Sequence, residues 1–338
     1  MLNKTLYING IGSINASPST TTVSNHHRCV DPDYKKYLDA TASRRLGRLI
    51  KMALIASKEC LKNAEISVPD AIITGTGLGC LADTEKFLNN MLENETGVHS
   101  PTSFIQSTHN TISGQIAIML QCKGYNNTYS HRSLSFERAL EDVQLLLAEG
   151  DAENVLLGSA DEMPNNTHQI TQKIGLFRSL NSKKNTPIAG EGVHYFLCSN
   201  SQTGKTLAKL IGTETIQGET SNEDLKEIIL HFLSKHQLDL SEIDTLVLGA
   251  NEDAKTDNHY AFVMDQLFPA SSLLHFKHHT GEYFTASAFG LVLACQFLKD
   301  KVVPEQFILK KQIQAPRTVL VYNHFKGVNH SLFLVQHV

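Results

Sequence analysis

The sequence predicts an α/β protein in which strands and helices alternate. Three runs, residues 70–77, 154–161 and 245–250, are short, mainly apolar and close on small residues, as is typical of strands buried on both faces. Between them lie segments with apolar residues at positions i, i+3 and i+4, the spacing of amphipathic helices. Strands that alternate with helices in this way indicate βαβ units and a largely parallel sheet.

Each half of the chain shows this alternation. In the first half the pattern predicts strands at residues 6–11, 70–77, 126–129, 154–161 and 190–197, and helices at residues 41–64, 83–92, 116–120 and from about 130 to 150. In the second half it predicts strands at residues 207–213, 245–250, 319–322 and 331–335, and helices at residues 222–237, 259–267 and 286–298. Both series end in a pair of neighbouring strands, which indicates an internal structural duplication.

Punctuating residues set the boundaries of these elements. Pro69 precedes the strand at 70–77, and Gly124 and Gly150 stop the helices before them. The Ser- and Thr-rich residues 13–25 predict a loop. The polar run at residues 106–111 fits either a solvated loop or a helix start that faces a subunit or an active site.

Composition places the chain among ordinary globular proteins. Its 338 residues are 41% hydrophobic and 19% charged, enough to bury a large core in one domain or in two packed ones. A net charge of −4 gives no footprint for nucleic acid or for an anionic membrane. No apolar run approaches the roughly 18–20 residues of a membrane span, and the first residues do not resemble a signal peptide, so we expect a cytoplasmic protein.

Two glycine-containing motifs are only partly matched. Gly75, Gly77 and Gly79 lack the spacing of a dinucleotide fingerprint, so we expect them to form a backbone turn near a site or an interface. Residues 204–206, Gly-Lys-Thr, resemble the end of a phosphate loop but lie between two strands, and we expect a hairpin turn there.

Metal and redox chemistry find little support in the sequence. The six cysteines form no C-x-x-C pair. The nearest approach to a metal site is His275, His278 and His279, but no Cys or carboxylate cluster joins them at a recognised spacing, and loop or interface histidines are the simpler interpretation. We therefore expect no metal and no cofactor.

The junction after the strand at 126–129 is the strongest candidate for chemistry. It places Ser130 between a strand and a helix, where backbone N–H groups and the helix dipole favour developing negative charge. Many enzymes hold a nucleophile at such a helix N-terminus. The alternative is a Ser/Thr-rich N-cap without chemistry.

Six short motifs follow one another along the chain in an order known from one family. They are Gly114-Gln115-Ile116-Ala117, Thr128-Tyr129-Ser130, Gly158-Ser159-Ala160-Asp161, Gly190-Glu191-Gly192, Lys277-His278-His279-Thr280-Gly281-Glu282 and Phe325-Lys326-Gly327-Val328-Asn329. In this order they resemble the landmarks of the β-ketoacyl synthases of the thiolase-like superfamily, over nearly the whole chain. The resemblance implies a thiolase-like fold with two similar βαβ-rich halves in αβαβα layers: a ketosynthase-like half at residues 1–204 and a shortened C-terminal half at residues 205–338.

The resemblance also implies which positions carry the chemistry, and here the chain departs from the family. The nucleophilic Cys corresponds to Ser130, the first catalytic His falls most plausibly at Asn251, and the second His becomes Glu282. The Lys of the same loop is retained as Lys277 and the gating Phe as Phe325. A hydroxyl needs a strong base, and an anion at position 282 would oppose a developing enolate or oxyanion. Condensing activity is therefore not expected.

The expected function is that of a non-catalytic subunit, similar to the chain length factors of bacterial type II polyketide systems. Such a subunit would pair with an active β-ketoacyl-ACP synthase in fatty acid or polyketide-type biosynthesis. Residues 104–111 and 41–45 resemble ketosynthase-like proteins of aryl polyene and flexirubin-type pathways. Two alternatives stay open: an acyltransferase or hydrolase with Ser130 as nucleophile and Glu282 or a histidine as base, and a module that binds acyl carrier protein or an acyl chain. Tyr129 and Phe325 are expected at the acyl channel.

The resemblance further implies a dimer. In the family, the strand before the nucleophile pairs with its equivalent in a second subunit, and here that strand holds Asn126, Asn127 and Thr128. It is short and polar, and it leaves an edge that a partner must cover. His109 and Asn110 are expected at the same interface. An active ketosynthase or a second copy of this chain would cover the edge equally well, and acyl carrier protein is a further candidate partner.

Overall fold

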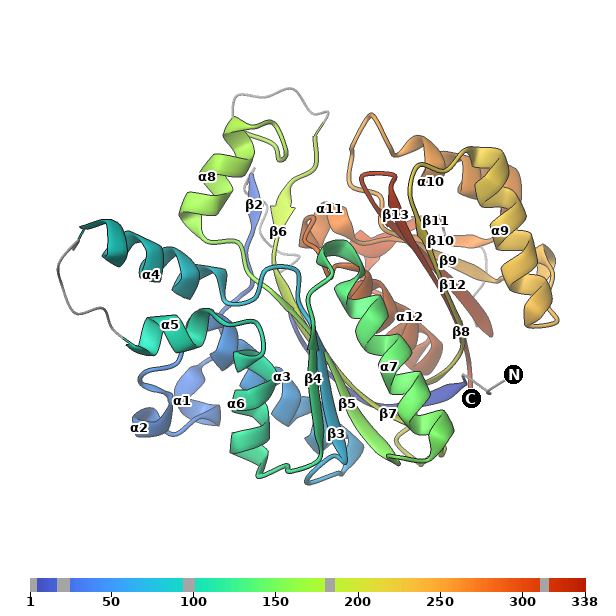
Figure 1. The fold of residues 1–338 in the computed structure, drawn as a ribbon. Coiled ribbons are helices and arrows are strands. Elements are labelled where there is room, and N and C mark those ends of the chain that lie inside the picture. Colours follow the sequence, from blue (N-terminus) through green and yellow to red (C-terminus); the bar gives the residue numbers. More distant parts are fainter. Residues whose placement is uncertain (1–4, 17–24, 94–100, 180–185, 311–315) are drawn as a thin grey trace.

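The computed structural model describes residues 5–16, 25–93, 101–179, 186–310 and 316–338, and its main feature is one mixed sheet of 11 strands (Figure 1). The strands of this sheet are β1 (Leu6–Ile14), β3 (Ala71–Gly75), β4 (Tyr125–Tyr129), β5 (Asn154–Asp161), β7 (Gly192–Ser199), β8 (Ala208–Gln217), β9 (Thr245–Leu248), β10 (Ser272–His275), β11 (Ile308–Lys310), β12 (Thr318–Phe325) and β13 (Asn329–Gln336). A second, two-stranded sheet consists of β2 (His26–His27) and β6 (Ala189–Gly190).

The helices pack against both faces of this sheet. They are α1 (Tyr34–Tyr37), α2 (Ala40–Ser43), α3 (Arg48–Ala64), α4 (Leu81–Glu93), α5 (Pro101–Ser107), α6 (Thr111–Leu120), α7 (Ser135–Glu149), α8 (Asn165–Lys173), α9 (Asn222–Lys235), α10 (Asn258–Phe262), α11 (Lys277–Thr280) and α12 (Ser287–Asp300). Short 3-10 turns occur at Arg132–Leu134, Leu240–Glu242 and Glu305–Phe307, and one π-helical turn at Val263–Leu267. None of the helices in the described ranges is long and apolar enough to cross a membrane.

The strand order β11-β10-β9-β12-β13-β8-β1-β7-β5-β3-β4 repeats one pattern on both sides of its centre. On one side β3 is parallel to β4 and β5, and β7 is antiparallel to β5 and β1. On the other side β9 is parallel to β10 and β12, and β13 is antiparallel to β12 and β8. A short antiparallel pairing of β1 with β8 joins the two halves. The predicted duplication is confirmed. The boundary that we propose between the two halves, between residues 204 and 205, lies in the connection between β7 and β8.

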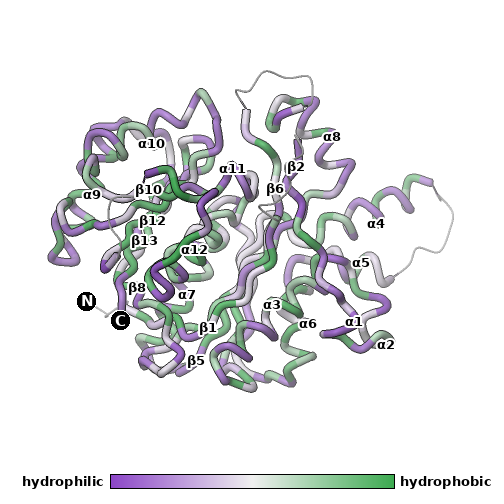
Figure 2. The backbone as a smooth tube through the Cα atoms, turned by 180° about the vertical axis from the view of Figure 1, so that it is seen from behind, coloured by the Kyte–Doolittle hydropathy of each residue, from purple (hydrophilic) through white to green (hydrophobic). Residues whose placement is uncertain are grey.

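Three clusters of buried apolar residues separate five layers. The central cluster joins α7 and α12 to the inner faces of both half-sheets, a second lies between α3 and the outer face of the first half-sheet, and a third lies between α9 and the outer face of the second. Strand β12 shows the division, since Val319 and Val321 face the central cluster while Leu320 and Tyr322 face the third. Hydrophobic stretches accordingly run through the central strands and α12 in Figure 2. The predicted αβαβα layering is confirmed.

Several element boundaries differ from the sequence-based expectations. The helix expected at residues 41–64 is broken into α2 and α3, with Gly47 as the N-cap of α3. The polar run at residues 106–111 contains the turn between α5 and α6. The hairpin expected at residues 204–206 is wrong, because β1 lies between β7 and β8 and pairs with both.

Candidate functional site

Asp161, the last residue of β5, fixes the backbone around the site. One carboxylate oxygen accepts hydrogen bonds from Gly77 N at 2.8 Å and Thr76 Oγ1 at 3.2 Å. The other accepts from the backbone and hydroxyl of Thr285, at 2.9 and 2.8 Å, just before α12. Gly77 has no room for a Cβ because the Phe284 ring lies against it. Asp161 thus ties the glycine-rich turn to the segment that enters α12.

Asn251, Lys277 and Glu282 meet in one buried cluster. Asn251 Nδ2 donates to Glu282 Oε2 at 2.6 Å, and Lys277 Nζ donates to the same oxygen at 2.8 Å. Lys277 Nζ also donates to the carbonyl of His324 at 3.0 Å. The Lys277 side chain is 0% exposed and that of Glu282 is 3% exposed. The three positions singled out in the sequence therefore form one hydrogen-bonded unit.

The three side chains of this cluster include no imidazole, and burial perturbs the groups around it. Burial raises the pKa of Glu282, and the ammonium of Lys277 offsets part of that effect. The adjacent His324 ring is stacked on Tyr260 with centroids 4.1 Å apart. Burial holds the pKa of His324 well below its usual range, and Lys277 lowers it further. His324 is thus a neutral ring at pH 7. The sequence reasoning missed it because its neighbours come from distant segments.

A second buried carboxyl, Glu137, lies on α7. Burial raises its pKa to about 7, and the Ser287 and Ser331 hydroxyls and the Lys277 ammonium offset only part of that rise. It is 2% exposed. Phe136 beside it is an apolar core residue, so nothing in the local sequence distinguished Glu137 from a solvated helix glutamate.

Replacing Glu137 by glutamine should change the pH dependence of stability. The folded pKa of about 7 exceeds the ordinary value of 4.5, so the folded state holds this proton more tightly, and the resulting stability is lost as pH rises through 7. Glutamine stays neutral throughout. The free energy of unfolding of Glu137→Gln minus that of the native protein should therefore be about 2–3 kcal/mol larger at pH 8 than at pH 5. Chemical denaturation at both pH values measures it.

A control on the same helix is Glu141→Gln. Glu141 is partly exposed and paired with Arg138 at 2.6 Å, so its substitution should change the free energy of unfolding by less than about 1 kcal/mol at either pH. A difference for Glu137→Gln that stays constant from pH 5 to pH 8 would show that Glu137 does not titrate in this range.

The junction before α7 differs from the expected one in a way that concerns Ser130. Helix α7 begins at Ser135, preceded by the 3-10 turn, so the expectation that the helix begins at Ser130 is wrong. Ser130 is exposed and belongs to neither β4 nor the turn. Ser133 within the turn is 4% exposed, and its hydroxyl accepts a hydrogen bond from Asn329 Nδ2 at 2.9 Å. Two serines at the start of this helical segment are buried, Ser133 in the turn and Ser135 at the first position of α7.

An apolar cavity of about 200 Å³ opens beside the junction. Its apolar walls are Leu78, Met163, Leu176, Phe177, Phe284 and Phe325. The rings of Phe284 and Phe325 are 5.2 Å apart, so the expectation that Phe325 lies at a channel fits its position at the end of β12. Tyr129 does not line the cavity. Its hydroxyl lies near Asp142 of α7, and burial, reinforced by that carboxylate, raises its pKa to about 12.

The residues expected at an interface lie on and near β4, at one end of the sheet (Figure 1). Asn126 is exposed and donates to Ser113 O at 3.1 Å. The hydroxyls of Thr128 and Ser113 are hydrogen-bonded at 2.7 Å. Asn127 Nδ2 donates to the hydroxyl of Tyr125 at 3.1 Å. The outer edge of β4 has no neighbouring strand within the described part of the chain.

His109 and Asn110 lie in the turn between α5 and α6, and both are exposed. Gly79, in the glycine-rich turn, lies so close to His109 that a Cβ there would be 3.1 Å from the His109 ring. Nearby exposed apolar side chains are Ile118 on α6, 70% exposed, and Tyr125, 45% exposed. Such side chains at an open strand edge are compatible with a covering partner.

The three histidines considered as metal ligands pack against each other instead. The His275 and His278 rings are stacked with centroids 3.4 Å apart, and the Nε2 atoms of His278 and His279 both lie within 3.1 Å of Gln306 O. Burial lowers the pKa of His278 to about 3. Among the residues that the structure describes, no group of three or more ligand side chains is arranged to hold a metal ion.

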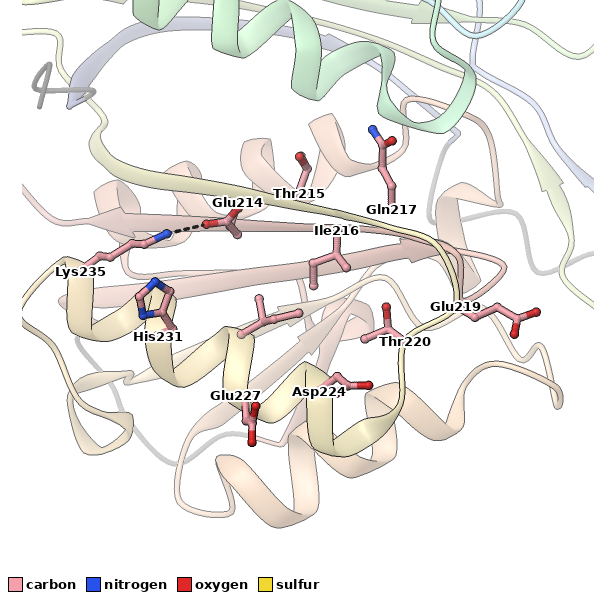
Figure 3. Close-up of a pocket in the computed structure, with 11 residues that line it drawn as sticks. Glu214, Thr215, Ile216, Gln217, Glu219, Thr220, Asp224, Glu227, His231 and Lys235 are labelled. Carbon is pink, nitrogen blue, oxygen red and sulfur yellow. Dashed lines mark hydrogen bonds and ion pairs between the residues drawn. The ribbon is translucent and has the colours of Figure 1, made fainter.

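A surface groove larger than the apolar cavity lies elsewhere, between β8 and α9, with a volume of about 710 Å³. Its walls are mostly polar, and the Glu214–Lys235 ion pair crosses one end at 3.3 Å (Figure 3). None of Asn251, Lys277, Glu282 and Ser133 lines it. The volume of a groove or cavity therefore does not identify the functional site in this molecule.

A family model described as the N-terminal domain of β-ketoacyl synthases matches residues 21–235. The chain belongs to the β-ketoacyl synthase family. Among curated proteins, it is 26% identical over 160 residues to 3-oxoacyl-[acyl-carrier-protein] synthase 2 of Synechocystis sp.. That match covers 45% of this chain and 38% of the relative, so the chain spans well under half of the curated relative's length.

Solved structures share the fold along nearly the whole chain. The ishigamide ketosynthase/chain length factor has a TM-score of 0.75 at 14% identity, with 99% of both chains covered. A ketosynthase in complex with its chain length factor from Xenorhabdus doucetiae has a TM-score of 0.76 at 16% identity, with 98% of both chains covered. A β-ketoacyl synthase from Burkholderia phymatum has a TM-score of 0.76 at 16% identity, covering 98% of this chain and 99% of that one. The thiolase-like fold expected from the sequence is confirmed.

Proposed function

We propose that this chain is a non-catalytic ketosynthase-like subunit, comparable to a chain length factor, that pairs with an active β-ketoacyl-ACP synthase. The observation that carries the proposal is the Asn251–Lys277–Glu282 cluster. In the family, the positions of Asn251 and Glu282 hold the histidines that assist condensation. Here they hold an amide and a buried carboxylate already bound to a lysine, and neither can act as a neutral imidazole.

The nucleophile position supports the same interpretation. The family's nucleophile begins the helix after the edge strand, and in this chain Ser133 and Ser135 are buried at that point. The hydroxyl of Ser135 is taken up by His131 N and Arg132 O, so we propose Ser133 rather than Ser130 as the degenerate position. The Ser133 hydroxyl accepts a hydrogen bond from the Asn329 amide, and no hydrogen bond joins it to a base among the described residues. A serine hydroxyl without an adjacent base is a weak nucleophile.

Pairing with a partner is supported by the open edge of β4 and by two relatives solved as a ketosynthase with its chain length factor. We extend the proposal to fatty acid or polyketide-type biosynthesis in the cytoplasm, with an aryl polyene or flexirubin-like pathway as its finer assignment. Acyl carrier protein is a proposed further contact, since one relative of the same fold was solved with its carrier protein.

The second candidate is an acyltransferase or hydrolase. The observation that favours it is the buried hydroxyl of Ser133, which accepts a hydrogen bond from Asn329 at the start of β13. Ser130, the nucleophile first considered for this activity, is exposed and lies outside both β4 and the 3-10 turn. Ser133 is therefore the better position for the nucleophile of this second candidate.

Co-purification with an active ketosynthase from the same source, followed by incubation with an octanoyl-acyl carrier protein, tests both candidates. We expect a 1:1 complex by light scattering and, by intact mass, no acyl group on this chain. Ser133→Ala should leave the complex and its overall condensing rate unchanged. Stoichiometric acylation that disappears in Ser133→Ala but persists in Ser130→Ala would reject the non-catalytic assignment and establish the second candidate.

A further inference from the structure

The second half of strand β8 has a neighbouring strand on one side only. The register of β8 with β1 ends at Leu210, whereas its register with β13 continues to Gln217. Residues 213–217, which we call the β8 edge, therefore face no other described strand on the side away from β13. This edge is separate from that of β4, because β1, β7, β5 and β3 lie between the two strands in the sheet.

Alternate residues of the β8 edge direct their backbone N–H and C=O groups away from β13. Gly218 N donates to Val328 O at 2.7 Å just beyond the strand, and this bond sets the alternation of hydrogen-bonded and non-bonded pairs along β8 and β13. By that alternation the outward-facing residues are Thr213, Thr215 and Gln217. No hydrogen bond joins their backbone groups to another described residue. An extended peptide beside the edge would pair with these groups, as in other cases of strand addition.

The β8 edge forms one wall of the groove between β8 and α9 (Figure 3). In this view the side chains of Glu214 and Ile216 point from β8 toward α9, and those of Thr215 and Gln217 point to the other side. The opposite wall is one side of α9 between residues 224 and 235. Because side chains alternate along a strand, every second side chain of an added strand would lie over α9.

The side chains around this groove are mainly acidic. There are four carboxylates, on Glu214, Glu219, Asp224 and Glu227, and one ammonium, on Lys235. Lys235 is paired with Glu214 at 3.3 Å, and the described residues provide no ion pair for the other three carboxylates, all of them exposed. This excess of negative charge repels nucleic acid and anionic lipid. It also disfavours a second copy of this chain at the β8 edge, because that copy would bring its own acidic groove.

We propose that the β8 edge binds an extended basic segment of a partner chain, which adds to the sheet as a strand with lysine or arginine side chains over α9. Pairing with the backbone of the edge supplies affinity, and the carboxylates of Glu219, Asp224 and Glu227 select basic side chains. One ligand of this kind pairs both the open backbone groups and the carboxylates that have no cation. The proposal does not depend on the pairing with a ketosynthase, which uses the edge of β4.

Fluorescence anisotropy of the labelled synthetic peptide TKVKVKT, titrated with the purified full chain, tests the proposal. We expect saturable binding, with an affinity at least tenfold higher than that of the acidic counterpart TEVEVET. The form of TKVKVKT with methylated backbone amides keeps the charges but lacks the donors for strand pairing, so its affinity should be at least tenfold lower. The double variant Glu219→Lys/Glu227→Lys should weaken the binding of TKVKVKT at least tenfold.

Glu149→Lys/Glu153→Lys is the matched control, because it makes the same change in net charge at two exposed residues that do not line the groove. It should change the affinity for TKVKVKT less than twofold, and thermal unfolding of each variant verifies that it is folded.

Three results would each overturn the proposal: no saturable binding of TKVKVKT, equal binding of its methylated form, or equal affinity in the native protein and in folded Glu219→Lys/Glu227→Lys. A homodimer in light scattering that TKVKVKT dissociates would make a second copy of this chain the occupant, and it would overturn the proposal as well. The measurement with an active ketosynthase tests the pairing by itself, so the two proposals fail separately.

Discussion

Replacing Lys277 by methionine should lower the free energy of unfolding by about 3–5 kcal/mol. The ammonium of Lys277 is fully buried, and its contacts to Glu282 Oε2 and to His324 O are 2.8 and 3.0 Å long. Methionine has a similar volume but leaves the Glu282 carboxylate buried with only Asn251 as donor. A buried charge without its counter-ion carries most of its desolvation cost. Urea denaturation at pH 7.5 measures the loss.

Lys235→Met is the matched control for this substitution. Lys235 pairs with Glu214 at 3.3 Å on the surface, and the two side chains are 48% and 32% exposed, so we expect a loss of less than about 1 kcal/mol. In the double variant Lys277→Met/Glu282→Gln no buried charge of the pair remains, and most of the loss should be recovered. Equal losses for Lys277→Met and Lys235→Met would show that the buried pair does not hold this site together.

The elements with strong local signals could be predicted from the sequence. The buried strands β3, β5 and β9 contain apolar runs, and the alternation of strands with helices and the duplicated series of elements indicated the fold class. The order of the strands in the sheet required the structure. The start of α7 could not be predicted as easily. Between Tyr129 and Phe136 stand six residues that are mostly small or polar, so a helix start fits the capping preference at several of them. The first buried apolar residue of the helix, Phe136, was the available signal for the later start.

The site itself depends on contacts that no local pattern encodes. Asn251 and Glu282 were singled out separately, but their hydrogen bond joins residues 31 positions apart, and the Ser133–Asn329 bond joins residues 196 positions apart. The positive φ of Arg132 is likewise set by the turn around it and not by its residue type. The positions of the cluster could therefore be predicted from the family pattern, whereas its hydrogen bonding required the structure.

Placing a lysine on β4 by Asn126→Lys should weaken association with the partner at least tenfold, about 1.4 kcal/mol. Asn126 is exposed on the strand at the end of the sheet, where the proposed partner would add its own strand. A charged side chain there must be desolvated on association, and edge lysines are a common means of preventing strand addition. Light scattering at micromolar concentration, with the chain alone and with its ketosynthase, measures the change from dimer to monomer.

Gln202→Lys makes the same chemical change on another exposed surface, in the connection between β7 and β8, and should leave association intact. Asn126→Lys removes the hydrogen bond from Asn126 Nδ2 to Ser113 O but leaves the pairing of β4 with β3, so it should lower the free energy of unfolding of the isolated chain by no more than about 1 kcal/mol. Association that persists in Asn126→Lys would mean that the partner does not use this edge, and the exposed Ile118 on α6 would then be the next position to substitute. If the chain stays monomeric with every ketosynthase tried, the proposed pairing is wrong. The proposed non-catalytic function is then wrong as well, because such a subunit acts only through its partner.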